Sequence, residues 1–135
     1  MTVRRYETEE IEVTYDTARC LHAAECVRGM PAVFDTTRRP WIVPNAGDPE
    51  ELAAVIRRCP TGALHYSRRD GKPEEPRVPT RIRWTDGGPL LLDGDLELGG
   101  HRETRAALCR CGDSGNQPYC DRSGPCRGWE YEPPR

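Results

Sequence analysis

Apolar and polar residues alternate over one short stretch near the start of the chain. Residues 10–15, EIEVTY, place an apolar side chain at every second position, which is the period of a strand with one buried face. Residues 63–66, ALHY, predict a second strand beside it, and residues 41–43, WIV, predict a further short strand. The first half should therefore contain a small sheet.

A helix is predicted between these strands. Asp48 is a good N-cap residue, Pro49 suits the first helical position, and Glu51 lies three residues after the cap. We expect the helix to continue to about Arg58 and to stop at Pro60, which cannot continue a helix. Residues spaced by three or four then share one face. They are Leu52, Val55, Ile56 and Cys59.

The second half predicts short strands followed by a long loop. Strand candidates lie at residues 80–84, 90–92 and 96–98, and glycine-rich turns separate them. From residue 109 onward glycine, proline and polar residues dominate. Such a loop cannot form an apolar core by itself and suits a metal centre.

A linker should divide the chain into two domains. Residues 67–80, SRRDGKPEEPRVPT, contain three prolines, one glycine and many charges, without apolar periodicity. We therefore predict an α+β protein with a first domain at 1–68, a linker at 69–80 and a β-rich second domain at 81–135.

Composition indicates that burial alone does not hold this chain together. Only 36% of its 135 residues are hydrophobic and 31% are charged, so its core must be small. The net charge of −2 comes from 20 basic and 22 acidic residues that are interspersed, which gives no footprint for nucleic acid. The sequence also shows neither a membrane-spanning apolar run nor a signal peptide, so we expect a cytoplasmic protein without membrane contact.

The cysteines are the strongest chemical signal. In a reducing cytosol an odd number of thiols, here seven, favours metal binding over disulfides. They fall into two groups, one in each predicted domain. The first group is Cys20, Cys26 and Cys59, and the second is Cys109, Cys111, Cys120 and Cys126.

The second group resembles the signature of the CDGSH iron–sulfur family, to which mitoNEET belongs. The resemblance lies in residues 109–123, CRCGDSGNQPYCDRS, where the cysteines and Ser114, Pro118, Asp121 and Ser123 match. It implies a 2Fe-2S cluster held by three cysteines and one histidine. Cys109, Cys111 and Cys120 would take the cysteine roles.

Two positions depart from that pattern. Arg122 replaces a glycine, and Gly124 stands where the family has its ligand histidine. Glycine has no side chain to bind iron, and thiolate is the commonest protein ligand of iron–sulfur clusters, so Cys126 is our preferred fourth ligand. The alternatives are Ser123, Asp121, His101 or an incomplete site.

A structural zinc site is the alternative for this loop, because four cysteines can satisfy tetrahedral Zn²⁺. Zinc sites usually pair their cysteines as C-x₂₋₄-C knuckles. Here a C-x-C pair is followed by a distant third cysteine, which favours the iron–sulfur interpretation.

The first cysteine group resembles divergent single-cluster ferredoxin domains. Cys20 and Cys26 match the first and third cysteines of the run C-x₂-C-x₂-C, Ala23 replaces the second, and Cys59 is followed by proline as the remote cysteine. The resemblance implies a ferredoxin-like fold and a 3Fe-4S cluster on these three thiolates. His22 lies next to the missing position and is a candidate ligand for a fourth iron in a 4Fe-4S cluster; the alternative is an ordinary packing or hydrogen-bonding role.

Together these observations predict an iron–sulfur protein rather than an enzyme. No nucleophile–base pair, phosphate loop or paired carboxylates are recognisable. We expect one-electron transport to, or cluster transfer to, an unidentified redox or cluster-acceptor protein, and a homodimer remains open. The alternatives are a zinc-stabilised interaction module and an iron–sulfur redox sensor.

Overall fold

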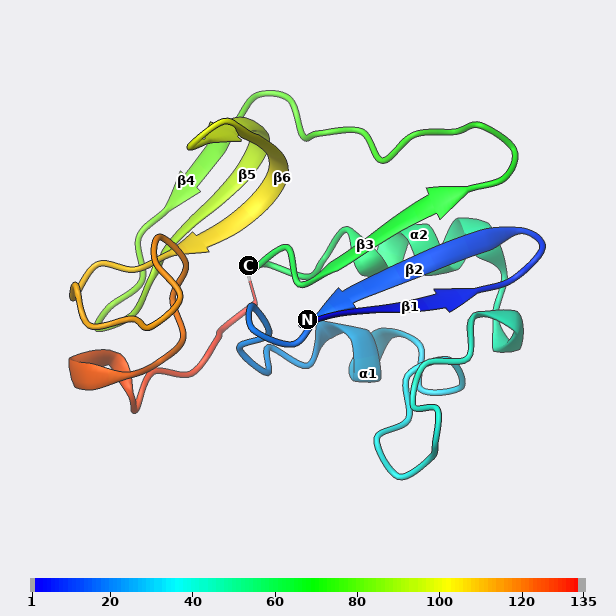
Figure 1. Ribbon diagram of the computed structural model, residues 1–135, viewed down its shortest axis with the longest axis horizontal. Coiled ribbons are helices and arrows are strands. Elements are labelled where there is room, and N and C mark those ends of the chain that lie inside the picture. Colours follow the sequence, from blue (N-terminus) through cyan, green and yellow to red (C-terminus); the bar gives the residue numbers. More distant parts are fainter. Residues whose placement is uncertain (1, 134–135) are drawn as a thin grey trace. The chain divides into compact units, whose positions relative to one another are not determined.

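The computed structural model describes residues 2–133 as two compact units (Figure 1). Both are built mainly from small sheets with few helices. The first unit comprises the residues up to Thr17, Ala24–Cys59 and Ala63–Glu74. The second comprises Ala18–Ala23, Pro60–Gly62 and the residues from Glu75 onward.

The sheet of the first unit has three antiparallel strands in the order β1-β2-β3. They are β1 (Val3–Glu7), β2 (Ile11–Asp16) and β3 (Leu64–Arg68). The two longer strand predictions are confirmed, and Val13 lies opposite Tyr66 in the register. The sequence did not predict β1, because nearly all of its side chains are exposed and it lacks a buried face.

Helix α2 (Pro49–Ile56) confirms the helix prediction. Its cap forms as expected, since the Asp48 carboxylate accepts hydrogen bonds from the amides of Glu50 and Glu51, each at 3.1 Å. The helix ends two residues earlier than predicted, with Arg57 as its C-cap. Helix α2 packs against β3 and against α1 (Glu25–Gly29).

The predicted strand at 41–43 is wrong. Only Ile42 takes part in pairing, through an isolated bridge to Phe34. Pro44 has no amide hydrogen to continue a ladder and instead begins the short 3₁₀ helix η1 (Pro44–Ala46). Ile42 still contributes a fully buried side chain to the core.

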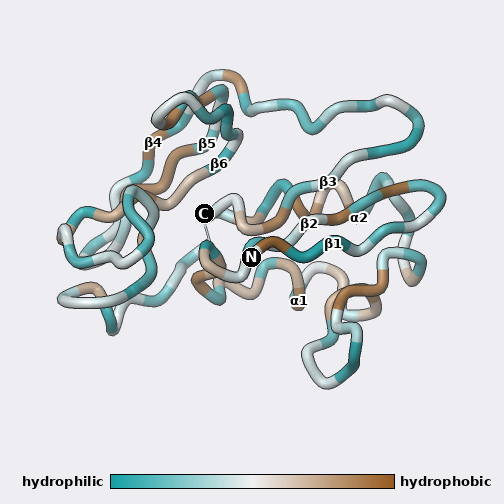
Figure 2. The backbone as a smooth tube through the Cα atoms, viewed as in Figure 1, coloured by the Kyte–Doolittle hydropathy of each residue, from teal (hydrophilic) through white to brown (hydrophobic). Residues whose placement is uncertain are grey.

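The core of the first unit lies between its sheet and its helices. Figure 2 colours β2 by hydropathy, and its aliphatic residues Ile11 and Val13 are buried. The apolar residues of α2 are buried in the same core. Cys26 and Cys59 pack at the margin of this core. Its buried members are Ile11, Val13, Val33, Phe34, Ile42, Leu52, Ala53, Val55, Ile56, Leu64 and Tyr66.

The second unit contains the antiparallel sheet β4-β5-β6. Its strands are β4 (Arg81–Arg83), β5 (Leu90–Leu98) and β6 (His101–Leu108), followed by the 3₁₀ helix η2 (Gly124–Cys126). The segments 90–92 and 96–98 are parts of one strand, because a register shift interrupts the pairing between them without ending it. Strand β6 was not predicted, since its first residues are polar.

The second unit has a small core to which cysteines contribute. Leu21, Leu91 and Ala107 are buried together with the thiols of Cys120 and Cys126. Free cysteines can act as small apolar side chains, and here they replace a larger hydrophobic layer. Across the described residues, no helix is long and apolar enough to cross a membrane.

We predict that Asp48→Ala destabilises the first unit by about 1 kcal/mol, because two amides at the start of α2 lose their acceptor. Asp48→Asn is the matched control, since asparagine caps a helix nearly as well as aspartate. The free energy of unfolding, measured by urea denaturation with circular dichroism, should fall for alanine and stay close to wild type for asparagine. Equal losses in both variants would contradict the capping role.

Candidate metal centre

The loop of the second cysteine group is closed by backbone hydrogen bonds at the end of β6. The amide of Cys109 donates to the Pro118 carbonyl, and the amide of Cys120 donates to the Ala107 carbonyl, both at 2.8 Å. An isolated bridge joins Leu108 to Tyr119 between them. The two ends of the predicted ligand run are therefore brought together by strand pairing.

All four thiols of this group approach one another in series. The Sγ atoms of Cys109 and Cys111 are 3.8 Å apart, and Cys126 lies 4.0 Å from Cys111 and 4.0 Å from Cys120. Among residues 2–133, no three His, Cys, Asp or Glu side chains form a group that could hold a single metal ion. Each thiol thus contacts one or two of the others, and the four sulfur atoms do not surround one point.

Backbone amides point at three of these sulfur atoms. The amide of Gly112 lies 3.3 Å from the Sγ of Cys109, that of Asp113 lies 3.5 Å from Cys111, and that of Arg122 lies 3.4 Å from Cys120. Hydrogen bonds to cysteine sulfur stabilise thiolate charge and tune the potential of an iron–sulfur cluster. The loop is therefore arranged to receive negative charge.

The pKa of the Cys109 thiol is lowered, whereas the pKa values of Cys111 and Cys126 are raised. The backbone amide of Ser114 lowers the pKa of Cys109 to about 7, with further help from the amide of Gly112 and the side chain of Gln117. The Gln117 Nε2 atom donates to this sulfur at 3.3 Å. Cys109 therefore reaches the thiolate form that metal binding requires more easily than an ordinary cysteine.

Cys126 has different surroundings. Burial raises the pKa of its thiol, and the neighbouring Cys120 raises it further. The thiol donates to the Ser123 carbonyl at 3.0 Å, an oxygen that would repel a thiolate. Binding of iron by Cys126 would require this hydrogen bond to break, with the positive charge of the metal replacing it.

The alternative fourth ligands are engaged elsewhere. The Ser123 hydroxyl donates to Asp121 Oδ1 at 2.5 Å, and this bond is the main cause that lowers the pKa of Asp121. Asp121 also accepts from the amide of Gly115 at 2.9 Å, which fixes the loop. His101 begins β6, whereas the cysteines follow the end of that strand. The assignment of Cys126 as ligand remains a prediction.

The backbone explains the departure at Gly124 but not the one at Arg122. Arg122 has a φ of 62°, a left-handed conformation that glycine adopts without strain. Gly124 has a φ of 66°, and a Cβ atom there would lie 2.5 Å from Asp113 Oδ2. A histidine at position 124 would therefore be strained in this loop.

The first cysteine group is divided between the two units. Cys26, in α1, and Cys59, after α2, pack at the core of the first unit. Cys20 lies in the segment Ala18–Ala23 of the second unit. Between them His22 and Ala24 both have positive φ, at 58° and 64°, and such strained residues concentrate at functional loops.

We predict that Gly124→Ala destabilises the protein by at least about 1 kcal/mol, because alanine is strained at positive φ and its Cβ would meet Asp113. Gly128→Ala is the matched control, because its Cβ would meet nothing within 4 Å and its φ is unexceptional. Gly124→His should lose at least as much stability as Gly124→Ala. Thermal unfolding checks this, and a wild-type midpoint for Gly124→His would show that the loop accepts a side chain.

Comparisons with known proteins place Cys20, Cys26 and Cys59 in one matched range and Cys109, Cys111 and Cys120 in another, and Cys126 lies outside both. Residues 6–69 match the family described as a divergent 4Fe-4S mono-cluster, and residues 87–123 match the iron-binding zinc finger of CDGSH type. Over 66 residues, 49% of this chain, the sequence is 42% identical to the uncharacterized protein YjdI from Escherichia coli strain K12 and from E. coli O157:H7, and the match covers 87% of each relative. No solved structure matches. The chain therefore belongs to the iron–sulfur proteins with a divergent 4Fe-4S mono-cluster domain, followed here by a CDGSH-type iron-binding domain.

Proposed function

We propose that this iron–sulfur protein carries single electrons between partner proteins and is not itself a catalyst. A 2Fe-2S cluster would be held in the second unit by all four cysteines of its group, Cys109, Cys111, Cys120 and Cys126. A 3Fe-4S or 4Fe-4S cluster would be held by Cys20, Cys26 and Cys59 in a ferredoxin-like domain. The clusters supply reversible one-electron chemistry, and the chain supplies ligands, hydrogen bonds and burial.

The arrangement of the four thiols carries this proposal. A two-iron cluster takes two protein ligands on each iron, so its thiolates form two pairs, whereas a tetrahedral zinc ion requires all four sulfurs around one point. The thiols here approach in series, from Cys109 to Cys111, then Cys126, then Cys120. Cys109 and Cys111 would share one iron, and Cys120 and Cys126 the other. The contact between Cys111 and Cys126, also 4.0 Å, would then have to lengthen when the cluster binds.

Several features favour electron transfer over cluster delivery. Amide hydrogen bonds to the sulfurs of Cys109, Cys111 and Cys120 stabilise a bound cluster in place. Ligation by Cys126 would replace a histidine, which protonates near neutral pH, with a thiolate. A firmly held cluster is better suited to redox cycling with a protein partner, which we place in the cytoplasm.

The first test is the metal content of anaerobically purified protein, together with its visible spectrum. We expect about five irons per chain if the first cluster is 3Fe-4S, or about six if it is 4Fe-4S, with matching acid-labile sulfide. Cys126→Ser should lose about two irons, because the second cluster loses a ligand. Cys59→Ser is the matched control, since it should lose the iron of the first site and keep about two irons.

Other results for metal content, sulfide content or cluster transfer would refute parts of this proposal. A colourless protein that contains zinc and no sulfide would refute the redox proposal in favour of a zinc-stabilised interaction module. Full iron content in Cys126→Ser would refute Cys126 as the fourth ligand while leaving the cluster itself in place. Release of the intact cluster to an apo-acceptor faster than electron exchange would favour cluster delivery.

A further inference from the structure

A buried arginine directly precedes Cys20 and has no ligand role in either predicted cluster. Arg19 is only 7% exposed, although it carries a permanent charge. It lies in the segment Ala18–Ala23, which packs as part of the second unit. Burying such a charge is costly unless it is fully paired, so its contacts indicate what it is for.

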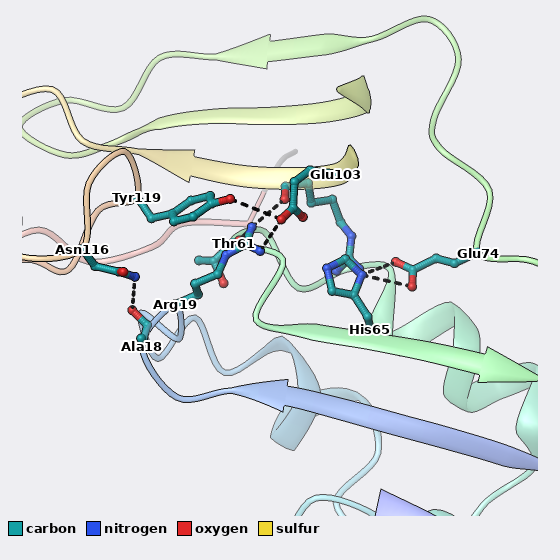
Figure 3. A network of polar contacts seen from close by, with 9 residues as sticks. Ala18, Arg19, Thr61, His65, Glu74, Glu103, Asn116 and Tyr119 are labelled. Atoms are coloured by element: carbon teal, nitrogen blue, oxygen red, sulfur yellow. Dashed lines mark hydrogen bonds and ion pairs between the residues drawn. The ribbon is translucent and has the colours of Figure 1, made fainter. Parts of the chain in front are cut away.

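The guanidinium of Arg19 makes three hydrogen bonds within the second unit (Figure 3). Its Nη1 atom pairs with Glu103 Oε1 of β6 at 2.7 Å, and the Glu103 side chain is itself nearly buried. Its Nη2 atom donates to the carbonyls of Thr61 at 2.8 Å and Arg105 at 3.0 Å. One side chain thus fastens two short segments to β6.

The same guanidinium holds the residue that precedes a predicted ligand. Its central carbon lies 4.1 Å from the ring centroid of Tyr119, within the range of a cation–π contact. The Tyr119 hydroxyl donates to Glu103 Oε1 at 3.3 Å. Tyr119 therefore contacts both members of the ion pair, Arg19 through its ring and Glu103 through its hydroxyl. Cys120 follows Tyr119 directly, so the contacts that hold this ring lie one residue from a predicted ligand.

Neighbours of Arg19 make further contacts with the cysteine loop. The Asn116 side chain donates to the Ala18 carbonyl at 3.2 Å, and Arg122 Nη1 donates to the Leu21 carbonyl at 3.4 Å. Leu21 is 4% exposed and packs in the cluster of side chains that contains Cys120 and Cys126. The segment therefore packs against the buried thiols of the cysteine loop.

Gly62 shows that the local backbone accommodates this arginine. Its φ is 74°, and a Cβ atom there would lie 2.4 Å from the Arg105 carbonyl oxygen and 2.5 Å from Arg19 Nη2. Any side chain would strain the backbone and displace the guanidinium. The sequence therefore combines a buried arginine with a glycine that makes room for it.

We propose that Arg19 is a positioning residue of the second cluster, which holds Tyr119 and through it the ligand Cys120, while residues 18–23 pack against the cysteine loop. This inference rests on the proposed function, because it concerns the same four thiolates. The Arg19 and Glu103 charges form a neutral pair beside the cysteine loop. The positive charge of Arg19 should raise the reduction potential of the cluster, and the negative charge of Glu103 should lower it.

The test compares Arg19→Met, Arg19→Lys, Glu103→Gln and the Arg19→Met/Glu103→Gln double variant in the full-length protein. Arg28→Met is the matched control, because Arg28 pairs with Glu25 at 2.8 Å on an exposed surface. The readouts are the reduction potential of the two-iron signal, followed by electron paramagnetic resonance, and the rate at which an iron chelator bleaches that cluster.

Arg19→Met should lower the reduction potential, because Glu103 is left as an unbalanced negative charge, and should speed cluster loss roughly tenfold. Glu103→Gln should raise the potential, and the double variant should return it towards wild type. Arg19→Lys should keep the potential near wild type but speed cluster loss, since lysine keeps the charge without the planar donors. Arg28→Met should change neither quantity.

Two results would overturn the positioning role while leaving the proposed function standing. One is a wild-type potential and bleaching rate in Arg19→Met. The other is a shift of the same sign in Arg19→Met and Glu103→Gln, which indicates general loosening of the fold. If Arg19→Met does not fold, Arg19→Lys and Glu103→Gln decide the question. Wild-type protein without acid-labile sulfide would instead refute the proposed function and this inference with it.

Discussion

The second unit depends on a small buried core in which cysteine thiols replace larger apolar side chains. Its buried apolar residues are few, and the thiols of Cys120 and Cys126 lie among them. Thiols bury less apolar area than leucine or isoleucine, so this core contributes little by itself. A bound metal group would therefore stabilise the fold of the loop. The same metal–sulfur bonds would order the loop and provide its chemistry.

Polar contacts compensate for the small core. The Asp121 carboxylate ties together two parts of the cysteine loop, and the Ser114 hydroxyl donates to the Tyr119 carbonyl at 2.5 Å. The Arg19 and Glu103 pair anchors the same loop from outside. These bonds fix the backbone whose amides face the sulfurs, so the scaffold that orders the loop also sets the polarity around the thiolates.

The sequence predicted the chemistry better than the complete topology. Helix α2 was readable because Asp48 and Pro49 form a cap and its apolar residues recur at helical spacing. Strand β1 could not be predicted, because it is an exposed edge strand and its sequence shows no buried face. The cysteine loop was found through its spacing, but the conformation at Gly124 that disfavours a histidine depends on Asp113, which only the folded backbone brings near. Arg19 gave no signal, since a single arginine in a sequence with many basic residues does not reveal burial.

The second unit is built from three separate stretches of the chain. Residues 18–23 and 60–62 belong to that unit although they lie within the sequence range of the mono-cluster family. A cut in the linker at 69–80 would consequently remove Arg19, Leu21 and Gly62 from the CDGSH-type half and expose the place that they fill. A chain that begins after this linker should therefore lose part of the buried core of the second unit and unfold more easily than the same residues in the full chain.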